Sequence, residues 1–185
     1  MKRTLTLLLL AGGAVALTAC ATLQSGPVGN ASVPEPAKPV DLNRYAGLWY
    51  EIARYEAGFQ RGCEAVTATY EVRDDGQVGV LNTCRQDGLN GALRSADARA
   101  RVVEGSDNAK LKVSFFGPFY VGDYWVLDRA EDYSWSIVGE PSGRYLWLLS
   151  RSPQPSPQVR ETIMTRAREL GYDLSILRQT QQPEA

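Results

Sequence analysis

Residues 65–84 read AVTATYEVRDDGQVGVLNTC, and this stretch decides the fold class of the chain. Apolar and polar residues alternate from Ala65 to Arg73, which is the period of a strand with one buried face. Asp74-Asp75-Gly76 follows, and an Asp-Gly pair is typical of the two-residue turn of a β-hairpin. Strand-like sequence resumes from Gln77 to Cys84. The stretch therefore predicts two antiparallel strands joined by a tight turn.

Similar strand signals continue on both sides of this hairpin. Polar turns, most of them containing Gly or Pro, separate six further short segments: 48–55, 92–103, 110–115, 121–128, 133–138 and 144–150. Eight consecutive strands with short connections predict an all-β fold, an eight-stranded antiparallel up-and-down β-barrel, because closure removes the exposed edges of a sheet.

One α-helix is expected after the strands. Ser156 is a suitable N-cap, Pro157 fits the first helical position, and Gly171 suits the termination. Only one narrow apolar stripe runs along the helix, so we expect it to pack on the outside of the barrel. Residues 174–177 are a candidate for a short last strand.

Length, charge and composition exclude several classes of function. The chain has 185 residues, a net charge of −1 and no histidine. Such a length suits one ordinary domain, and a near-neutral charge argues against a nucleic-acid partner. Without histidine, Ser-His-Asp and Cys-His catalysis, histidine-ligated haem and most zinc sites are excluded. We therefore expect no metal and no cofactor.

The first 20 residues have the pattern of an export signal. Lys2 and Arg3 precede an apolar stretch that is too short to span a membrane comfortably. It ends in LTAC at residues 17–20, which resembles the lipobox of bacterial lipoproteins. The resemblance implies a signal peptide at 1–19, acylation of Cys20, and outer-membrane sorting because residue 21 is Ala and not Asp. An ordinary secretory signal is the alternative.

Two domain boundaries follow from this pattern. Residues 20–40 are small, polar and Pro-rich, and we expect a lipidated tether there, followed by one folded domain at 41–185. Because the lipobox uses Cys20, the remaining Cys63 and Cys84 are expected to form a disulfide in an oxidising compartment. Two buried thiols remain the alternative, since the predicted hairpin register does not place the two cysteines opposite each other.

Several motifs resemble one known family. GLWY at 47–50 is similar to the motif that opens the lipocalins, and YLWLLSR at 145–151 is similar to their last-strand motif. WYEIARY at 49–55, VTATY at 66–70 and KVSFFGPFY at 112–120 resemble the bacterial outer-membrane lipocalins, which also resemble apolipoprotein D. The middle lipocalin motif departs from the family pattern, with Asp128-Arg129 followed by Tyr133 downstream.

The resemblance implies roles for the motif residues. Gly47, Trp49 and Arg151 are expected to close one end of the barrel, with the arginine packed over the indole, and to do no chemistry. Side chains alternate along a strand. Inward Arg151 therefore places Leu149, Trp147 and Tyr145 inside, and inward Trp49 places Glu51, Ala53 and Tyr55 inside.

The barrel interior is the expected binding site. Small residues at 53, 68, 98 and 100 leave volume there, which a long acyl chain fills well, although bulky side chains from the opposite wall are an alternative. The loop 56–62 is a candidate lid, with a polar head group meeting Arg61 or Tyr55. The expected ligand-binding residues are Tyr55, Phe59, Arg61, Tyr70, Phe115, Tyr145 and Trp147.

Together these features predict a binding protein and not an enzyme. The protein is expected to hold a fatty acid or a lysophospholipid. We expect Cys20 to anchor it in the outer membrane with its domain in the periplasm. A homodimer is a further candidate arrangement. The alternatives are a lipocalin-fold enzyme acting on a lipid and a structural envelope lipoprotein with a filled barrel. Glu51 is the single acid proposed for the interior, and general acid–base catalysis usually needs a partner.

Overall fold

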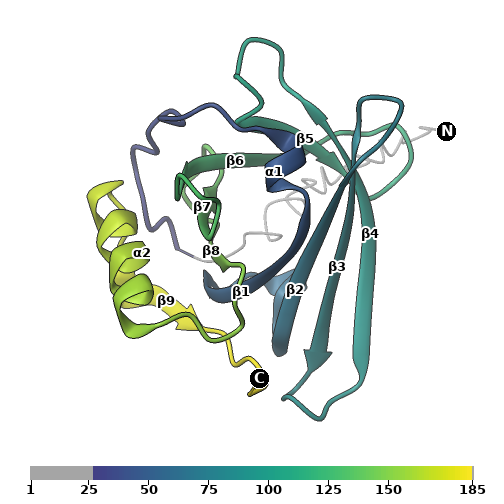
Figure 1. The fold of residues 1–185 in the computed structure, drawn as a ribbon. Helices are drawn as coiled ribbons and strands as arrows, with labels where there is room; N and C mark the ends of the chain where they lie inside the picture. The colour runs from purple at the N-terminus through teal and green to yellow at the C-terminus, as the bar shows by residue number, and fades with distance from the viewer. Residues whose placement is uncertain (1–26, 185) are drawn as a thin grey trace, which may run out of the picture.

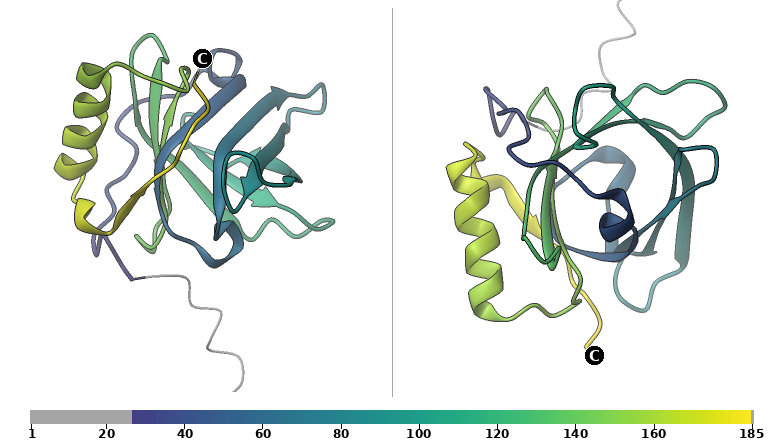
Figure 2. Two further views of the ribbon diagram at one scale, coloured as in Figure 1. Left: turned by 90° about the horizontal axis from the view of Figure 1, so that it is seen from below. Right: turned by 45° about the horizontal axis from the view of Figure 1, so that its top comes forward.

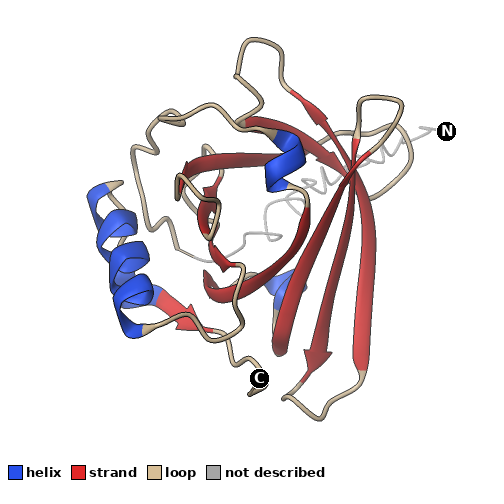
Figure 3. Ribbon diagram, in the orientation of Figure 1, coloured by secondary structure: helices blue, strands red, loops and turns tan. Residues whose placement is uncertain are grey.

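One antiparallel sheet dominates the structure and closes on itself to form a barrel (Figures 1 and 3). The computed structural model describes residues 27–184, so the predicted signal peptide and Cys20 lie outside the described residues. The strands are β1 (Gly47–Tyr55), β2 (Cys63–Val72), β3 (Val78–Gln86), β4 (Leu93–Val102), β5 (Lys110–Ser114), β6 (Gly122–Arg129), β7 (Trp135–Gly139), β8 (Leu146–Ser150) and β9 (Leu177–Gln179). From β1 to β8, neighbouring strands in chain order pair with each other, and β8 pairs with β1 to close the barrel. The predicted eight-stranded up-and-down barrel is confirmed.

The hairpin of β2 and β3 forms where the alternation predicts it, but its turn is one residue longer than expected. Val72 pairs with Val78, and the backbone N–H of Arg73 donates to the carbonyl of Gln77 at 2.9 Å. Asp74, Asp75 and Gly76 therefore form a three-residue loop. Such loops often place a residue in the left-handed region at the end, and Gly76 has a φ of +76°. The expected two-residue turn is wrong.

The connections divide between the two ends of the barrel. Because the strands alternate in direction, the loops 56–62, 87–92, 115–121 and 140–145 all lie at one end, called the open end. At the opposite, closed end, the short helix α1 (Leu42–Tyr45) lies across the barrel, as the right view of Figure 2 shows. Asp41 caps α1 by accepting hydrogen bonds from the N–H groups of Asn43 and Arg44.

A bulge in β1 divides the apolar residues between two cores. Its register against β8 shifts between Glu51 and Ala53. Before the shift, Trp49 belongs to the inner core, which lies inside the barrel and includes Tyr45, Tyr70, Val80, Ala98, Val113 and Leu149. After the shift, Ala53 and Tyr55 belong to the outer core between the barrel and the C-terminal helix. The prediction that these two residues face the interior is wrong, because a bulge reverses the alternation that the prediction assumed.

The C-terminal helix α2 (Pro157–Glu169) packs outside the barrel, as its narrow apolar stripe predicts. The Ser156 hydroxyl accepts a hydrogen bond from the N–H of Val159, and Pro157 begins the helix. Ile163 and Ala167 are fully buried in the outer core. The helix therefore thickens one side of the wall, as Figure 1 shows, and leaves the interior free.

The last segment of the chain completes the wall of the barrel. After the 3-10 turn η2 (Leu174–Ile176), β9 pairs with the second half of β1, on the side where the first half pairs with β2. Beyond β9, the N–H of Ala65 in β2 donates to the carbonyl of Gln181. The amide of Gln182 donates to the carbonyls of Glu51 and Val66. Residues 177–182 thus fill a seam between β1 and β2.

Most of the Pro-rich segment packs on the barrel, contrary to the expectation of a tether that reaches residue 40. The N–H groups of Gly29 and Asn30 donate to the carbonyl of Gly143, and the side-chain amide of Asn30 donates to the carbonyl of Leu170. Val40 is 2% exposed and belongs to the inner core. Specific hydrogen bonds offset the ordering entropy on which the tether prediction rested.

Cys63 and Cys84 form a disulfide, as the cysteine count predicts. The register of β2 against β3 shifts between Glu64 and Thr67. This irregularity brings together two cysteines that a regular ladder would separate. Within residues 27–184, no helix is long and apolar enough to cross a membrane, and no cluster of acidic or cysteine side chains could hold a metal ion.

Candidate functional site at the open end of the barrel

The closed end is sealed by Trp49 and Arg151. The guanidinium of Arg151 lies 3.8 Å from the centroid of the Trp49 ring, and the indole N–H donates to the carbonyl of Tyr45 at 2.8 Å. Arg151 also donates to the carbonyls of Leu48 and of residues 44–46 at the end of α1. The arginine thus ties the short helix to the base of the barrel, and its position agrees with the role that the family motif implies.

Gly47 permits this arrangement. Its φ is +91°, a conformation that residues with a side chain rarely adopt. The structure thus brings the three motif residues together at the closed end, and their role in closing the barrel stays a prediction.

A hydrogen-bonded group of tyrosines crosses the barrel above Trp49. The hydroxyl of Tyr124 lies 2.8 Å from that of Tyr70 and 2.9 Å from that of Tyr45, which also lies 3.1 Å from the Ser136 hydroxyl. Burial raises the pKa of Tyr45 to about 12, and burial also raises the pKa values of Tyr70 and Tyr124. These hydroxyls therefore stay protonated near neutral pH, and they form an uncharged floor. Tyr70, expected to contact ligand, is part of this floor.

Aromatic rings line the interior above the floor. Tyr145 and Trp147 stack with their centroids 5.6 Å apart and their planes 2° apart, and Phe59 lies 5.8 Å from Tyr145. Trp147 packs against the inner core but is only partly buried, whereas Trp49 is fully buried. Leu149, Trp147 and Tyr145 share the inner face as parity predicts. The inner face of β8 and the residue before it thus present two stacked, partly exposed aromatic rings.

A charged pair, Glu51 and Arg54, lies on the same wall. The sequence predicted Glu51 there but not Arg54. Arg54 is fully buried and donates to Glu51 at 2.7 Å, to Thr180 at 3.2 Å, and to the carbonyls of Gln60 and Cys63. Gln60 donates to Glu51 at 2.5 Å and accepts the indole N–H of Trp147 at 3.0 Å. Glu51 faces inward as expected, but the bulge adds Arg54 to the same face. The cluster fixes the loop 56–62 at the mouth.

The other expected ligand-binding residues fall in three places. Arg61 and Phe59 lie in the loop 56–62 at the mouth, and both are exposed. Phe115 follows the end of β5 and is about half exposed. Tyr55 lies in the outer core, where its hydroxyl donates to the carbonyl of Asp173 at 2.8 Å. The expectation that Tyr55 binds ligand inside the barrel is therefore wrong. The ligand contacts of the other residues stay predictions.

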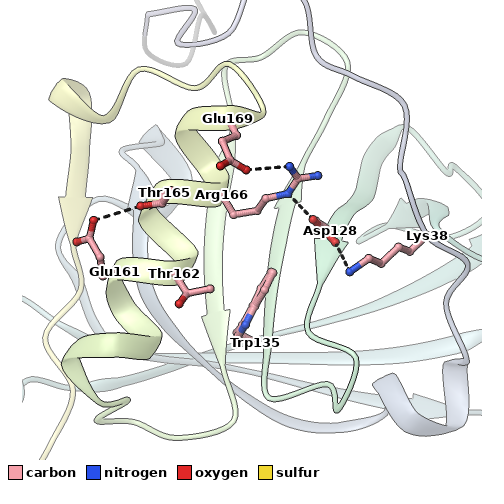
Figure 4. A pocket seen from close by; sticks show the side chains of 8 residues that line it. All are labelled: Lys38, Asp128, Trp135, Glu161, Thr162, Thr165, Arg166 and Glu169. Carbon is pink, nitrogen blue, oxygen red and sulfur yellow. Dashed lines mark hydrogen bonds and ion pairs between the residues drawn. The ribbon is translucent and has the colours of Figure 1, made fainter.

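A hollow of about 600 Å³ lies outside the barrel beneath α2 (Figure 4). Asp128 in its wall accepts from Arg166 at 2.5 Å and from Lys38 at 3.2 Å. Burial opposes ionisation of Asp128, but these hydrogen bonds and that of the Arg129 N–H outweigh burial and lower its pKa. Lys38, Asp128, Arg166 and Glu169 form ion pairs with one another in this hollow, and these pairs attach α2 and the N-terminal segment to the barrel.

The residues at which the chain departs from the family's middle motif make contacts at the closed end. The guanidinium of Arg129 lies 4.2 Å from the centroid of the Tyr133 ring, and Arg44 lies 4.3 Å from that centroid. Arg129 also donates to the carbonyl of Pro39, and the Tyr133 hydroxyl accepts the N–H of Asp41. Asp128-Arg129 and Tyr133 therefore hold the entry segment against the closed end.

Comparisons with known proteins agree with this geometry. Residues 40–182 match the lipocalin-like domain family. The chain belongs to the lipocalin family. This lipocalin is 43% identical over 174 residues to the outer membrane lipoprotein Blc of Vibrio cholerae, covering 91% of this chain and 98% of the relative. It is 30% identical over 162 residues to rat apolipoprotein D, covering 83% of each chain.

Solved structures show the same fold at low sequence identity. Insecticyanin from the tobacco hornworm Manduca sexta superposes with a TM-score of 0.65 at 20% identity, over 87% of this lipocalin and 89% of insecticyanin. The resemblance to lipocalins and to apolipoprotein D inferred from the sequence motifs is therefore confirmed. Lipocalins are generally binding and transport proteins, which favours a binding site in the barrel over a catalytic site.

Proposed function

We propose that this lipocalin is an outer-membrane lipoprotein, acylated at Cys20, whose domain faces the periplasm. The LTAC sequence at residues 17–20 and the similarity to a protein named outer membrane lipoprotein Blc support the anchor and the location. The cleaved signal at 1–19 belongs to the same proposal. Two or more acyl chains suffice for stable attachment to a bilayer. Cys20→Ser is expected to release the protein from membranes, and unchanged fractionation would contradict the anchor.

The proposed cargo is a single-chain amphiphile, a fatty acid or a lysophospholipid, held for storage or transport in the envelope. The observation that carries this proposal is the aromatic wall of Tyr145 and Trp147, partly exposed above an uncharged tyrosine floor. Ala98 and Val113 on the opposite wall keep 8% and 9% of their surface exposed, whereas Trp49 below keeps none. An acyl chain suits such an apolar space, and Arg61 at the mouth suits its polar head.

Binding is favoured over catalysis by the chemistry of the interior. Glu51 accepts hydrogen bonds from Arg54, Gln60 and Thr180, which is the arrangement of a structural ion pair. Cys63 and Cys84 are joined in a disulfide and offer no nucleophile. A homodimer stays a prediction, which sedimentation of the lipid-free protein would test.

Ligand titration of two tryptophan variants tests the proposal. Trp147→Ala is expected to weaken binding of oleate and of lysophosphatidylethanolamine by about 1–3 kcal/mol, the scale of one large buried apolar contact. Trp125→Ala is the matched control, because Trp125 lies on the outer side of the barrel, 4.0 Å from the Lys110 ammonium. Equal affinities for the parent and Trp147→Ala would refute the interior site. Native mass spectrometry showing a chemically altered lipid would favour an enzyme.

A further inference from the structure

The largest exposed apolar side chains gather at the open end. Among the exposed large hydrophobic residues of the described chain, six are at least 49% exposed, and all six lie in the open-end loops or at the strand ends beside them: Phe59, Leu93, Phe115, Phe116, Phe119 and Val121. At the closed end, the exposed Leu48 and Val72 reach only 42% and 38%. Concentrated apolar surface of this kind usually marks a site of interaction.

The loop 115–121 contributes four of the six and reads FFGPFYV, without a charged residue. The Gly117 carbonyl accepts hydrogen bonds from Ser114 at 3.1 Å and from Arg99 at 3.2 Å. Phe116 and Phe119 form an isolated bridge across the turn and remain 82% and 69% exposed. The wall therefore holds the loop in place while its phenyl rings project into solvent.

The described chain also begins at this end. Gly29 and Asn30 are fixed by hydrogen bonds to Gly143, which lies in the open-end loop 140–145. Nine peptide units separate Cys20 from Gly29, and a fully extended chain spans at most about 3.6 Å per residue, or about 32 Å in all. A ten-residue strand such as β2 is about as long as that span. An acylated Cys20 can therefore reach the bilayer easily when the open end faces it, and barely when the closed end does.

We propose that the open end is a membrane-contact surface, with the loop 115–121 inserted among the lipids of the bilayer that carries the Cys20 anchor. In the left view of Figure 2, the loops 56–62 and 115–121 and the start of the described chain lie along the same lower side of the molecule. Arg61 beside Phe59 and Arg94 beside Leu93 are exposed and suit anionic phospholipid head groups. This orientation rests on the proposed lipidation, and it lets an acyl chain pass between the bilayer and the barrel without crossing water.

Site-specific fluorescence in vesicles tests the orientation. The lipidated protein is placed in vesicles of phosphatidylethanolamine and phosphatidylglycerol, with an environment-sensitive dye on Phe116→Cys or, as control, on Asn43→Cys, an exposed position in α1 at the closed end. The dye at 116 is expected to shift to shorter wavelength and to be quenched by brominated lipid, while the dye at 43 stays in water. Equal or stronger quenching at 43 would overturn the proposal. So would a shift at 116 that follows protein concentration without lipid, because that result indicates a second copy.

A partition assay separates this inference from ligand binding. In a Cys20→Ser background, Phe116→Ser with Phe119→Ser is expected to weaken partition into the same vesicles at least about tenfold, since each phenyl ring leaves an apolar environment. Val72→Ser is the control and should change nothing. Oleate binding by the double variant should equal that of the parent. Failure of the parent to bind oleate would count against the cargo alone, and equal partition of all variants would overturn the membrane contact alone.

Discussion

The buried pair of Glu51 and Arg54 should dominate the stability of the upper barrel. The Arg54 side chain is 0% exposed and that of Glu51 is 3% exposed, so neither charge can be rehydrated without opening the wall. Removing one partner of a buried ion pair costs about 3–5 kcal/mol, because the remaining charge stays desolvated. We therefore expect Arg54→Met to lower the free energy of unfolding by about that amount. The loss should be measured by urea denaturation, with the m-value as a check on the two-state transition.

A double-mutant cycle makes this prediction refutable. Glu51→Gln combined with Arg54→Met removes both charges, so the double variant should lose less than the sum of the single losses, by about 1–3 kcal/mol. Arg73→Met is the matched control, because Arg73 is half exposed and lies 4.0 Å from Asp75. Such a pair is worth about 0–1 kcal/mol. Additive losses in the cycle, or an Arg54→Met loss no larger than that of the control, would refute the reasoning.

Three further predictions concern other contacts that stabilise the barrel. Cys84→Ser opens a loop with a sequence separation of 21 and should lower the free energy of unfolding by about 3 kcal/mol in a denaturant titration. Because hydrogen bonds from Arg166 and others outweigh burial and lower the pKa of Asp128 on folding, the parent should be more stable than Asp128→Asn above the carboxyl's unfolded pKa. That advantage should vanish as the pH falls through the folded pKa, so urea midpoints that differ equally at pH 7 and pH 2 would contradict it. Arg151→Met should lose a cation–π contact with Trp49 worth about 1–2 kcal/mol, together with its hydrogen bonds to carbonyls; an unchanged melting temperature would argue against this closure.

The sequence predicted those parts of the fold that depend on local periodicity. Alternation between Ala65 and Arg73 placed β2, and Ser156 with Pro157 placed the start of α2, because each signal acts within a few residues. The inward set of Tyr145, Trp147 and Leu149 also followed from parity, since β8 contains no irregularity against β7.

The errors have one physical origin, which is that long-range packing overrides local pattern. The bulge after Glu51 reversed the faces of Ala53 and Tyr55, and the same shift brought Arg54 inside; periodicity alone does not show a bulge. The Pro-rich segment looked unable to fold because its partners, such as Gly143, are remote in sequence. The sequence does hold one sign of this cluster: an arginine stands at position 54 in a strand that is otherwise largely apolar.

The seam filled by residues 177–182 has a consequence for folding. The wall between the second half of β1 and β2 is complete only when β9 has paired and the hydrogen bonds of Gln181 and Gln182 have formed, and these contacts join residues 116 or more positions apart in the sequence. Contacts of such long range form late, so closure of the barrel should be a late and slow step of folding. Until then, the upper edge of β1 lacks its partner β9, and exposed strand edges invite pairing with other chains. An unpaired edge that persists through this slow step would favour association between partly folded chains, and a substitution of Gln182 that weakens the seam would prolong the exposure.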